Sequence, residues 1–345
     1  MKIWYNKKAK SCTLITDRKT RRYFSGIDVD EGVILLSDKK YYLADARNFY
    51  AVKNLLISTD IIPVKYDGIE SIERILKSDK IKTLYIDYDN TTIRELETYK
   101  SFKIKIKDCS NWLKNLKSIK TETEVQKIKR ACEIVQDAFY ETVKEIKKGV
   151  TEKYLAEYIK NSMLKMGAED ISFDTIVAFQ ENSAVPHHQT GDTELKENQV
   201  VLIDVGCKVD GYCSDLTRTV FFGSPSDEFI KNYNAVLDAN LTAIDKITCG
   251  TLTCEADKFS RDKLKELGLD EYFTHSLGHG LGLNIHEFPS LSKKTQDVLK
   301  NGMTFTIEPG VYFDGKYGIR IEDTVILQDG KVHRLFTDEK KLIII

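Results

Sequence analysis

VLIDVGCKVDGYCSDLTRTV (residues 201–220) decides the fold of the larger part of this chain. Two runs rich in β-branched residues flank Asp-Gly at 210–211, a dipeptide typical of two-residue β-hairpin turns. If that turn is central, Asp204 faces Thr217 on the opposite strand. Asp204 and Asp215 then become diagonal neighbours on one face of the hairpin, with α-carbons roughly 7–8 Å apart. The segment therefore predicts an antiparallel strand pair that brings two aspartates together.

A second hairpin repeats this arrangement with glutamates. EPGVYF (308–313) and YGIRIE (317–322) flank the loop Asp-Gly-Lys. That loop length places Glu308 directly opposite Glu322, although Pro309 limits the hydrogen-bond ladder at this point. Two acids that face each other across a strand pair repel each other unless a cation lies between them.

A histidine lies between the two hairpins in the sequence. His279 occurs in HSLGHGLG (275–282), between glycines. Taken alone, such a histidine is more often a turn residue, and a lone strand acid is more often an edge or bulge residue. Together, however, four acids and one imidazole favour a site for two divalent cations, because close carboxylates stay ionised only with cations among them. The predicted metal ligands are Asp204, Asp215, His279, Glu308 and Glu322.

The nature of this ligand set narrows the chemistry. His275 and His279 have the i,i+4 spacing of a helical zinc motif, but the glycines around them argue against a helix, and the sequence has no HExxH. Carboxylates and an imidazole without thiolates suit Mn²⁺, Co²⁺, Fe²⁺ or Zn²⁺. Two-metal sites hydrolyse stable bonds, so we predict a dinuclear metallohydrolase.

Bulk properties limit the class of protein. The 345 residues predict two domains, and a formal net charge of −1 argues against a nucleic-acid partner. We expect no membrane span, since no apolar run reaches roughly 18 residues. We also expect a cytoplasmic protein, because the first 25 residues lack a signal peptide and the seven cysteines form no CxxC pair.

The pattern of the chain changes near residue 115. Up to that point, short apolar runs alternate with helical patterns, which predicts a small α/β domain over residues 1–115. Residues 116–345 predict an α+β domain with a largely antiparallel sheet. Its first helix begins at Thr121, which has capping-box spacing to Glu124, and is expected to stop at Gly149.

The motifs resemble those of a known family, the pita-bread metallopeptidases, and specifically their proline-peptidase branch of Xaa-Pro dipeptidases and aminopeptidase P. The resemblance covers nearly all of residues 119–328, and more weakly the creatinase-type N-terminal domain. It implies an α+β pita-bread catalytic domain preceded by a smaller α/β creatinase-like domain. The matching stretches are TETEVQKIKRA (121–131), SFDTIVAFQENSAVPHH (172–188), VLIDVGCKVDGYCSDLTRTV (201–220), HSLGHGLGLNIHEFP (275–289), GMTFTIEPGVY (302–312) and GIRIEDTV (318–325).

The resemblance also implies roles for the five ligands. Asp204 would chelate one ion, and Asp215 and Glu322 would bridge both ions. His279 and Glu308 would complete the coordination of the second ion, and Glu308 would also transfer a proton. The family favours Mn²⁺ or Co²⁺, with Zn²⁺ and Fe²⁺ as alternatives.

Further residues match catalytic and substrate-binding positions of the family. His187 would contact the substrate and stabilise the transition state, whereas the neighbouring His188 has no matching role. His286 would bind near the scissile carbonyl or the proline-side residue. The other matching positions are His275, an active-site histidine, Arg320, near the substrate carboxylate or the metal ligands, and Tyr312, which supports them.

These matches imply an exopeptidase that cleaves the bond before proline in short peptides and forms a homodimer. We favour a dipeptidase, with an aminopeptidase P acting on longer peptides as the alternative. A methionine aminopeptidase shares the five ligands but usually lacks both the N-terminal domain and the His-Glu-x-Pro element at 286–289. A metal-free relative, either an amidinohydrolase or a binding module, is disfavoured. Such proteins typically lack one or more of the metal ligands, and all five are present here.

Overall fold

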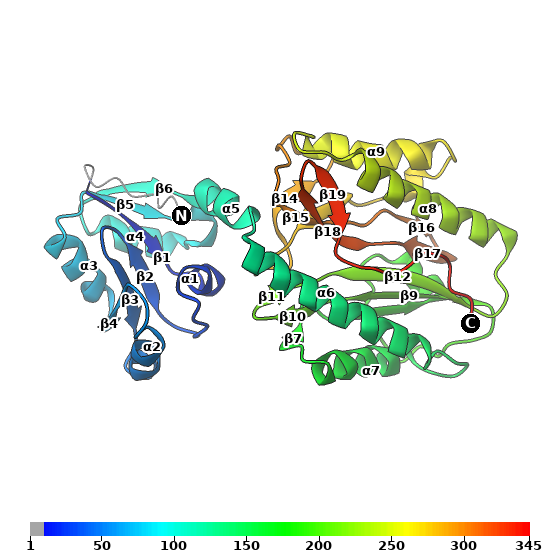
Figure 1. The fold of residues 1–345 in the computed structure, drawn as a ribbon, viewed down its shortest axis with the longest axis horizontal. Helices are drawn as coiled ribbons and strands as arrows, with labels where there is room; N and C mark the ends of the chain where they lie inside the picture. The colour runs from blue at the N-terminus through cyan, green and yellow to red at the C-terminus, as the bar shows by residue number, and fades with distance from the viewer. Residues whose placement is uncertain (1–9) are drawn as a thin grey trace. The chain divides into compact units, whose positions relative to one another are not determined.

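The computed structural model describes residues 10–345. The chain divides into two compact units, one ending at Lys117 and the other spanning Ser118–Ile345 (Figure 1). Each unit has its own sheets and its own hydrophobic core.

The first unit contains one six-stranded mixed sheet in the order β4-β3-β2-β1-β5-β6. Alternate residues of β2 belong to two different buried clusters, Val33 and Leu35 to one, Ile34 and Leu36 to the other. Both faces of the sheet are therefore covered, which agrees with the predicted α/β class. The strands are β1 (Ser11–Ile15), β2 (Val33–Leu36), β3 (Lys40–Ala44), β4 (Ile61–Lys65), β5 (Thr83–Ile86) and β6 (Lys105–Asp108). The helices are α1 (Arg18–Ser25), α2 (Phe49–Leu55), α3 (Ile69–Ser78), α4 (Ile93–Lys100) and α5 (Ser110–Ser118), with the short η2 (Tyr88–Asn90).

The second unit combines antiparallel strand pairs with four long helices, as an α+β domain does. Helices α6 and α7 contact the earlier strands and α8 and α9 the later ones, so the two helix pairs lie on opposite sides in Figure 1. The helices are α6 (Glu122–Val143), α7 (Glu152–Lys165), α8 (Asp227–Lys246) and α9 (Thr253–Lys265), with the short η3 (Gln180–Ala184) and η4 (Asp270–Tyr272).

The strands of the second unit form several small sheets. One has the order β12-β9-β8, another β14-β13-β15-β18-β19, and β16 pairs with β17. The strands are β7 (Asp170–Ile171), β8 (Ile176–Phe179), β9 (Gln199–Val205), β10 (Cys207–Val209), β11 (Tyr212–Cys213), β12 (Leu216–Phe222), β13 (Gly278–Gly280), β14 (Glu287–Leu291), β15 (Thr304–Ile307), β16 (Gly310–Phe313), β17 (Tyr317–Arg320), β18 (Asp323–Gln328) and β19 (Lys331–Arg334).

The predicted register of the first hairpin is confirmed. Val209 pairs with Tyr212 across the turn, and Asp204 pairs with Thr217. Asp210 and Gly211 both have positive φ, as a type I′ turn requires. The turn therefore sets which residues of β9 and β12 share a face.

The second hairpin also follows the predicted register. Gly310 pairs with Arg320 in β16 and β17, and the same register resumes where Ile307 of β15 pairs with Asp323 of β18. Glu308 and Glu322 lie in the gap between these two ladders. Their backbone N–H groups donate outside the hairpin. Glu308 N donates to Leu277 O, just before β13, over 2.9 Å, and Glu322 N donates to Thr217 O of β12 over 3.1 Å. The two glutamates thus occupy the place where three sheets meet.

Helix α6 begins as predicted but ends earlier. Thr121 and Glu124 form both hydrogen bonds of the capping box. The helix ends at Val143 rather than near Gly149, because the chain turns after Lys144 and Gly149 N donates instead to Leu195 O over 2.9 Å. The expected stop at Gly149 was wrong for the helix, although its positive φ of 85° does mark a change in chain direction.

Two further observations concern the whole described chain. Among residues 10–345, no helix combines the length and apolarity needed to cross a bilayer. All seven cysteines are free thiols, and five of them are buried. The free thiols agree with the expectation of reduced cysteines.

Candidate metal centre

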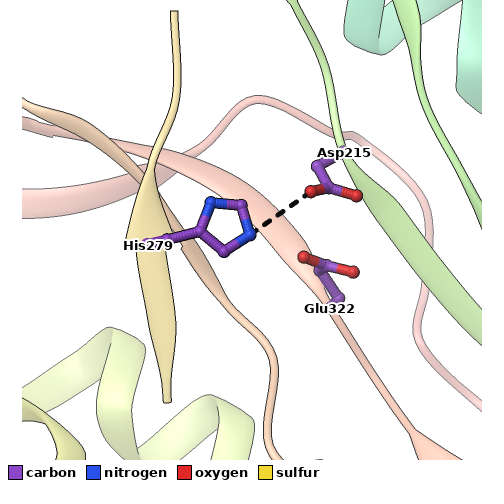
Figure 2. A group of neighbouring side chains, drawn as sticks. All are labelled: Asp215, His279 and Glu322. Atoms are coloured by element: carbon purple, nitrogen blue, oxygen red, sulfur yellow. Dashed lines mark ion pairs between the residues drawn. The ribbon is translucent and has the colours of Figure 1, made fainter. Parts of the chain in front are cut away.

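Three of the predicted ligands converge in the second unit. Asp215 precedes β12, His279 lies on β13, and Glu322 lies between β17 and β18. One ligand atom from each lies within 4.8 Å of the others, and His279 Nε2 is 3.6 Å from Asp215 Oδ2. Figure 2 shows the imidazole pointing toward the two carboxylates. Segments far apart in the sequence thus bring two acids and one imidazole to a single point.

Glu308 reaches the same imidazole from the segment after β15. Its Oε1 lies 3.5 Å from His279 Nε2 and accepts a hydrogen bond from Thr306 Oγ1 over 3.1 Å. Its Oε2 lies 4.0 Å from His275 Nδ1. The glutamate therefore has one oxygen held by a hydroxyl and a second oxygen that faces another histidine.

Asp204, the fifth predicted ligand, makes its contact with Arg320 rather than with His279. Arg320 Nη2 donates to Asp204 Oδ2 over 2.7 Å. The other oxygen, Oδ1, is buried without a hydrogen-bond partner among the described residues, and the same is true of Asp215 Oδ1. A buried carboxylate oxygen without a partner is costly, so both oxygens fit a site that binds cations.

The electrostatics of the carboxylates agree with this. Burial raises the pKa of Asp215 well above its ordinary value, and the charges of Glu322 and Asp204 raise it further. Burial, Glu308 and Asp204 likewise raise the pKa of Glu322. Burial raises the pKa of Glu308 to about 8, against the opposing effect of Arg320. Acids that resist ionisation together become a good ligand set when divalent cations neutralise them.

The two partly buried histidines of the centre favour their neutral form. Burial lowers the pKa of His279 to about 4, with a further contribution from His286. Burial lowers the pKa of His275 to about 3, and the charge of Arg320 adds to the effect. Neutral imidazole is the form that binds metals, so His279 is prepared for ligation at neutral pH.

A hydrogen-bonded chain connects His275 to the carboxylates. Its Nδ1 lies 2.8 Å from Ser276 O, so that nitrogen must carry the proton. Its Nε2, 2.8 Å from Tyr312 Oη, then accepts from the phenol. Tyr312 in turn accepts from Arg320 Nη1 over 2.8 Å, and Arg320 reaches Asp204. The chain fixes the tautomer of His275 and the orientation of the guanidinium.

The remaining two predicted histidines lie at the exposed side of the centre. His286 precedes β14, and its ring meets the ring of His279 edge to face, with centroids 4.4 Å apart. Partial burial and the charge of His187 lower the pKa of His286. His187 follows η3, is exposed, and also lowers the pKa of His275. Both side chains therefore lie where a bound molecule could reach them.

Three threonines that the sequence reasoning missed hold the acidic ligands in place, two through the carboxylate and one through the backbone. Thr217 Oγ1 donates to Glu322 Oε2 over 2.6 Å, as Thr306 does to Glu308. Thr324 Oγ1 donates to Asp215 O over 2.8 Å and accepts from Asp215 N over 3.1 Å. A signal for them was present, since each threonine lies two residues from a predicted acidic ligand, a spacing that keeps side chains on one face of an extended chain.

An α+β domain that gathers four carboxylates and one imidazole where its sheets meet is the architecture of a pita-bread metallohydrolase. The sequence matches the model of metallopeptidase family M24 over residues 126–329, and that of the creatinase/prolidase N-terminal domain over residues 4–119. The chain belongs to metallopeptidase family M24. The fold and the family implied by the sequence motifs are thereby confirmed, and membership implies divalent metal binding.

Proteins similar to this one in sequence and structure match almost the whole chain. An Xaa-Pro dipeptidase from Pyrococcus furiosus is 35% identical over 336 residues, which span 93% of this chain and 92% of that protein. A solved Xaa-Pro dipeptidase from Bacillus anthracis is 34% identical with a TM-score of 0.92, over 97% of this chain and 95% of that one. A solved X-Pro aminopeptidase from Thermotoga maritima is also 34% identical, with a TM-score of 0.90 over 97% of each chain.

Proposed function

We propose that this chain is an Xaa-Pro dipeptidase, a metal-dependent exopeptidase that hydrolyses the bond before proline in dipeptides. The observation that carries the proposal is the convergence of Asp215, His279 and Glu322, with Glu308 beside them. The similarity over almost the whole chain to two proteins described as Xaa-Pro dipeptidases supports the substrate class.

The proposed cofactor is a pair of divalent ions, with Mn²⁺ or Co²⁺ favoured over Zn²⁺ or Fe²⁺. When bound, the ions supply the positive charge that activates water and polarises the peptide carbonyl. The unpartnered oxygens of Asp204 and Asp215 and the neutral His279 support this choice of ligand set. The residues that would hold the ions are Asp204, Asp215, His279, Glu308 and Glu322.

Side chains of this protein would carry out the proton transfers. Glu308 Oε2, which Thr306 leaves free, would take a proton from the attacking water and deliver it to the proline nitrogen that leaves. His187 and His286, on the exposed side of the centre, would contact the substrate and donate to the oxygen that becomes negative in the transition state. Arg320 would hold Asp204 in a fixed orientation, and Tyr312 would hold Arg320 and His275.

An Xaa-Pro aminopeptidase that accepts longer peptides is the second candidate. The similarity to the Thermotoga maritima X-Pro aminopeptidase, at the same 34% identity, favours keeping it. We also propose that the enzyme is a homodimer and that it works in a reducing, cytoplasmic environment. The seven free thiols support the reducing environment. Light scattering of the purified enzyme would test the dimer.

A comparison of three peptides tests the function. Enzyme stripped with EDTA and refilled with Mn²⁺ is given Ala-Pro, Ala-Pro-Ala and Met-Ala-Ala. We expect cleavage of Ala-Pro, with Ala-Pro-Ala cleaved slowly or not at all. Preference for Ala-Pro-Ala would favour the aminopeptidase, and turnover of Met-Ala-Ala alone would overturn the proline specificity. Refilling with Co²⁺, Zn²⁺ or Fe²⁺ in parallel identifies the most active metal, and the Glu308→Gln variant gives the background rate.

A further inference from the structure

Outside the metal centre, the carboxylate of Glu152 is completely buried and fully hydrogen-bonded. Glu152 is the first residue of α7, and its side chain is 0% exposed. Phe179 N and Asn182 Nδ2 each donate to its Oε1 over 2.8 Å. His188 Nε2 lies 2.8 Å from its Oε2, and Gly191 N donates to the same oxygen over 3.1 Å. A buried carboxylate is costly unless it is hydrogen-bonded, and four partners here offset that cost.

All four partners belong to a single stretch of chain, residues 179–191, which we call the His187 segment. It begins at the end of β8, includes η3, and passes through VPHH at 185–188. Glu152 holds the beginning of the segment at Phe179, its end at Gly191, and its middle at His188. The position of Glu152 in the first turn of α7 also favours a negative charge there, because backbone N–H groups point outward at that end of a helix.

The His187 segment is held on a second side by β17. Gly318 N donates to Ser183 Oγ over 2.8 Å. A Cβ added at Gly318 would lie 2.0 Å from Ser183 O, so only glycine permits this close approach. β17 ends at Arg320, which donates a hydrogen bond to Asp204. The segment is therefore fixed between α7 and the strand that supports the metal centre.

The two adjacent histidines of the segment differ in their surroundings. The side chain of His188 is 16% exposed and lies against Glu152. His187 is exposed and follows η3, which contacts the strands that carry Asp204 (β9) and Arg320 (β17). One histidine is thus anchored inside the domain, and its neighbour is presented to the candidate substrate site.

We propose that the His188–Glu152 pair is a positioning device that fixes His187 in the orientation needed to contact the reacting peptide. The proposal rests on the proposed function, since it takes His187 to be a substrate contact. His188 itself touches no substrate and acts through its neighbour. Misplacing a catalytic contact by about 1 Å can reduce the rate about a hundredfold, so a loosened segment should lower kcat without weakening metal binding.

A double-mutant cycle tests the proposal on the metal-loaded, full-length enzyme with Ala-Pro as substrate. The variants are His188→Leu, His187→Ala and the two combined. We expect His188→Leu to lower kcat by about tenfold to a hundredfold, with KM and Mn²⁺ affinity little changed. In the His187→Ala background the same substitution should change kcat by less than about twofold, because residues that act as a unit are not additive.

Two further variants separate positioning from general stability. His188→Gln keeps a donor for Glu152 and should restore most of the lost kcat. His333→Leu, which removes an exposed histidine on β19, should leave activity unchanged. If His188→Leu does not fold, His188→Asn takes its place, since its shorter side chain does not reach Glu152.

The possible outcomes are distinct. An equal loss of kcat in both backgrounds, or a failure of His188→Gln to restore activity, would overturn the positioning role. Full activity of His187→Ala would overturn it as well, because His187 would then have no contact to be positioned for. By contrast, a wild-type enzyme that cleaves no proline peptide would refute the proposed function itself.

Discussion

Arg320 donates from Nη2 to Asp204 Oδ2 over 2.7 Å, so that a buried guanidinium on β17 holds a carboxylate on β9. The same group donates from Nη1 to Tyr312 Oη over 2.8 Å and from Nε to Thr217 Oγ1 over 3.1 Å. Three nitrogens of one planar group thus orient three different partners. An ammonium group is a point charge and cannot reproduce this fork.

Replacing Arg320 with lysine should therefore impair the metal centre even though the charge is kept. Loss of a group that orients a metal ligand typically reduces metal affinity or activity about 10- to 100-fold. We expect the Mn²⁺ concentration needed for half-maximal hydrolysis of Ala-Pro to rise by a factor in this range. The matched control is Arg130→Lys on α6, an arginine whose side chain is 52% exposed, which should behave as wild type. A wild-type Mn²⁺ dependence of Arg320→Lys would contradict the orienting role.

Thr217→Val should weaken metal binding while preserving the shape of the core. The hydroxyl of Thr217 donates to Glu322 over 2.6 Å and accepts from Arg320 over 3.1 Å, and valine removes both bonds. We expect metal affinity, measured by calorimetry, to fall about 10- to 100-fold.

The control for this variant is another buried threonine in a strand, Thr13→Val. The hydroxyl of Thr13 is buried without a hydrogen-bond partner among the described residues, so valine should leave metal affinity unchanged and stability unchanged or slightly higher. If both valine variants bind Mn²⁺ as tightly as wild type, the hydroxyl of Thr217 does not support Glu322.

The stability of the metal-free enzyme should fall as the pH rises from 6.5 to 8. In this window the unfolded chain has lost the proton of Glu308, whose ordinary pKa is 4.5, whereas the folded chain keeps it because burial raises that pKa to about 8. Asp215 and Glu322, with raised pKa values, act with the same sign. His275 and His279 act with the opposite sign, because their folded pKa values are low, but only below their ordinary value of 6.5.

Thermal unfolding of EDTA-treated enzyme measures this effect. Each proton that the folded state retains changes the free energy of unfolding by on the order of 1 kcal/mol per pH unit. We expect the midpoint temperature to fall from pH 6.5 to 8, and Mn²⁺ to abolish the fall. Glu308→Gln should reduce the slope. A midpoint of the metal-free enzyme that rises over this range would show that the acids are not protonated in the folded state.

Much of the metal centre could be predicted because two turns determine two registers. The Asp210-Gly211 turn pairs Asp204 with Thr217, and a three-residue loop sets the pairing of β16 with β17. Because side chains alternate between the two faces of a strand, a fixed register assigns each acid to one face. The backbone partners of Glu308 and Glu322 could not be predicted, because both residues form backbone hydrogen bonds with segments outside the hairpin.

The strands around His279 could not be predicted from local pattern. β13 contains Gly278 and Gly280, and glycine weakens a strand signal. These glycines are explained only by tertiary contacts, since a Cβ at Gly278 would lie 2.1 Å from Thr306 O and one at Gly280 2.3 Å from Phe288 O. β14 contains Pro289, which a strand tolerates at the edge of a sheet, and β14 is an edge strand.

A buried ion pair beside the centre gives a last prediction. Lys120 Nζ lies 2.7 Å from Glu287 Oε1, with side-chain exposures of 1% and 9%, and Glu287 follows His286. Lys120→Met should destabilise the protein by about 3–5 kcal/mol, because it leaves the carboxylate buried without its partner. The double variant Lys120→Met/Glu287→Leu should recover much of that loss, since an apolar pair of similar volume can replace a buried ion pair. Denaturant unfolding of the metal-loaded enzyme measures both. A double variant no more stable than Lys120→Met would mean that packing, rather than the unpaired charge, causes the loss.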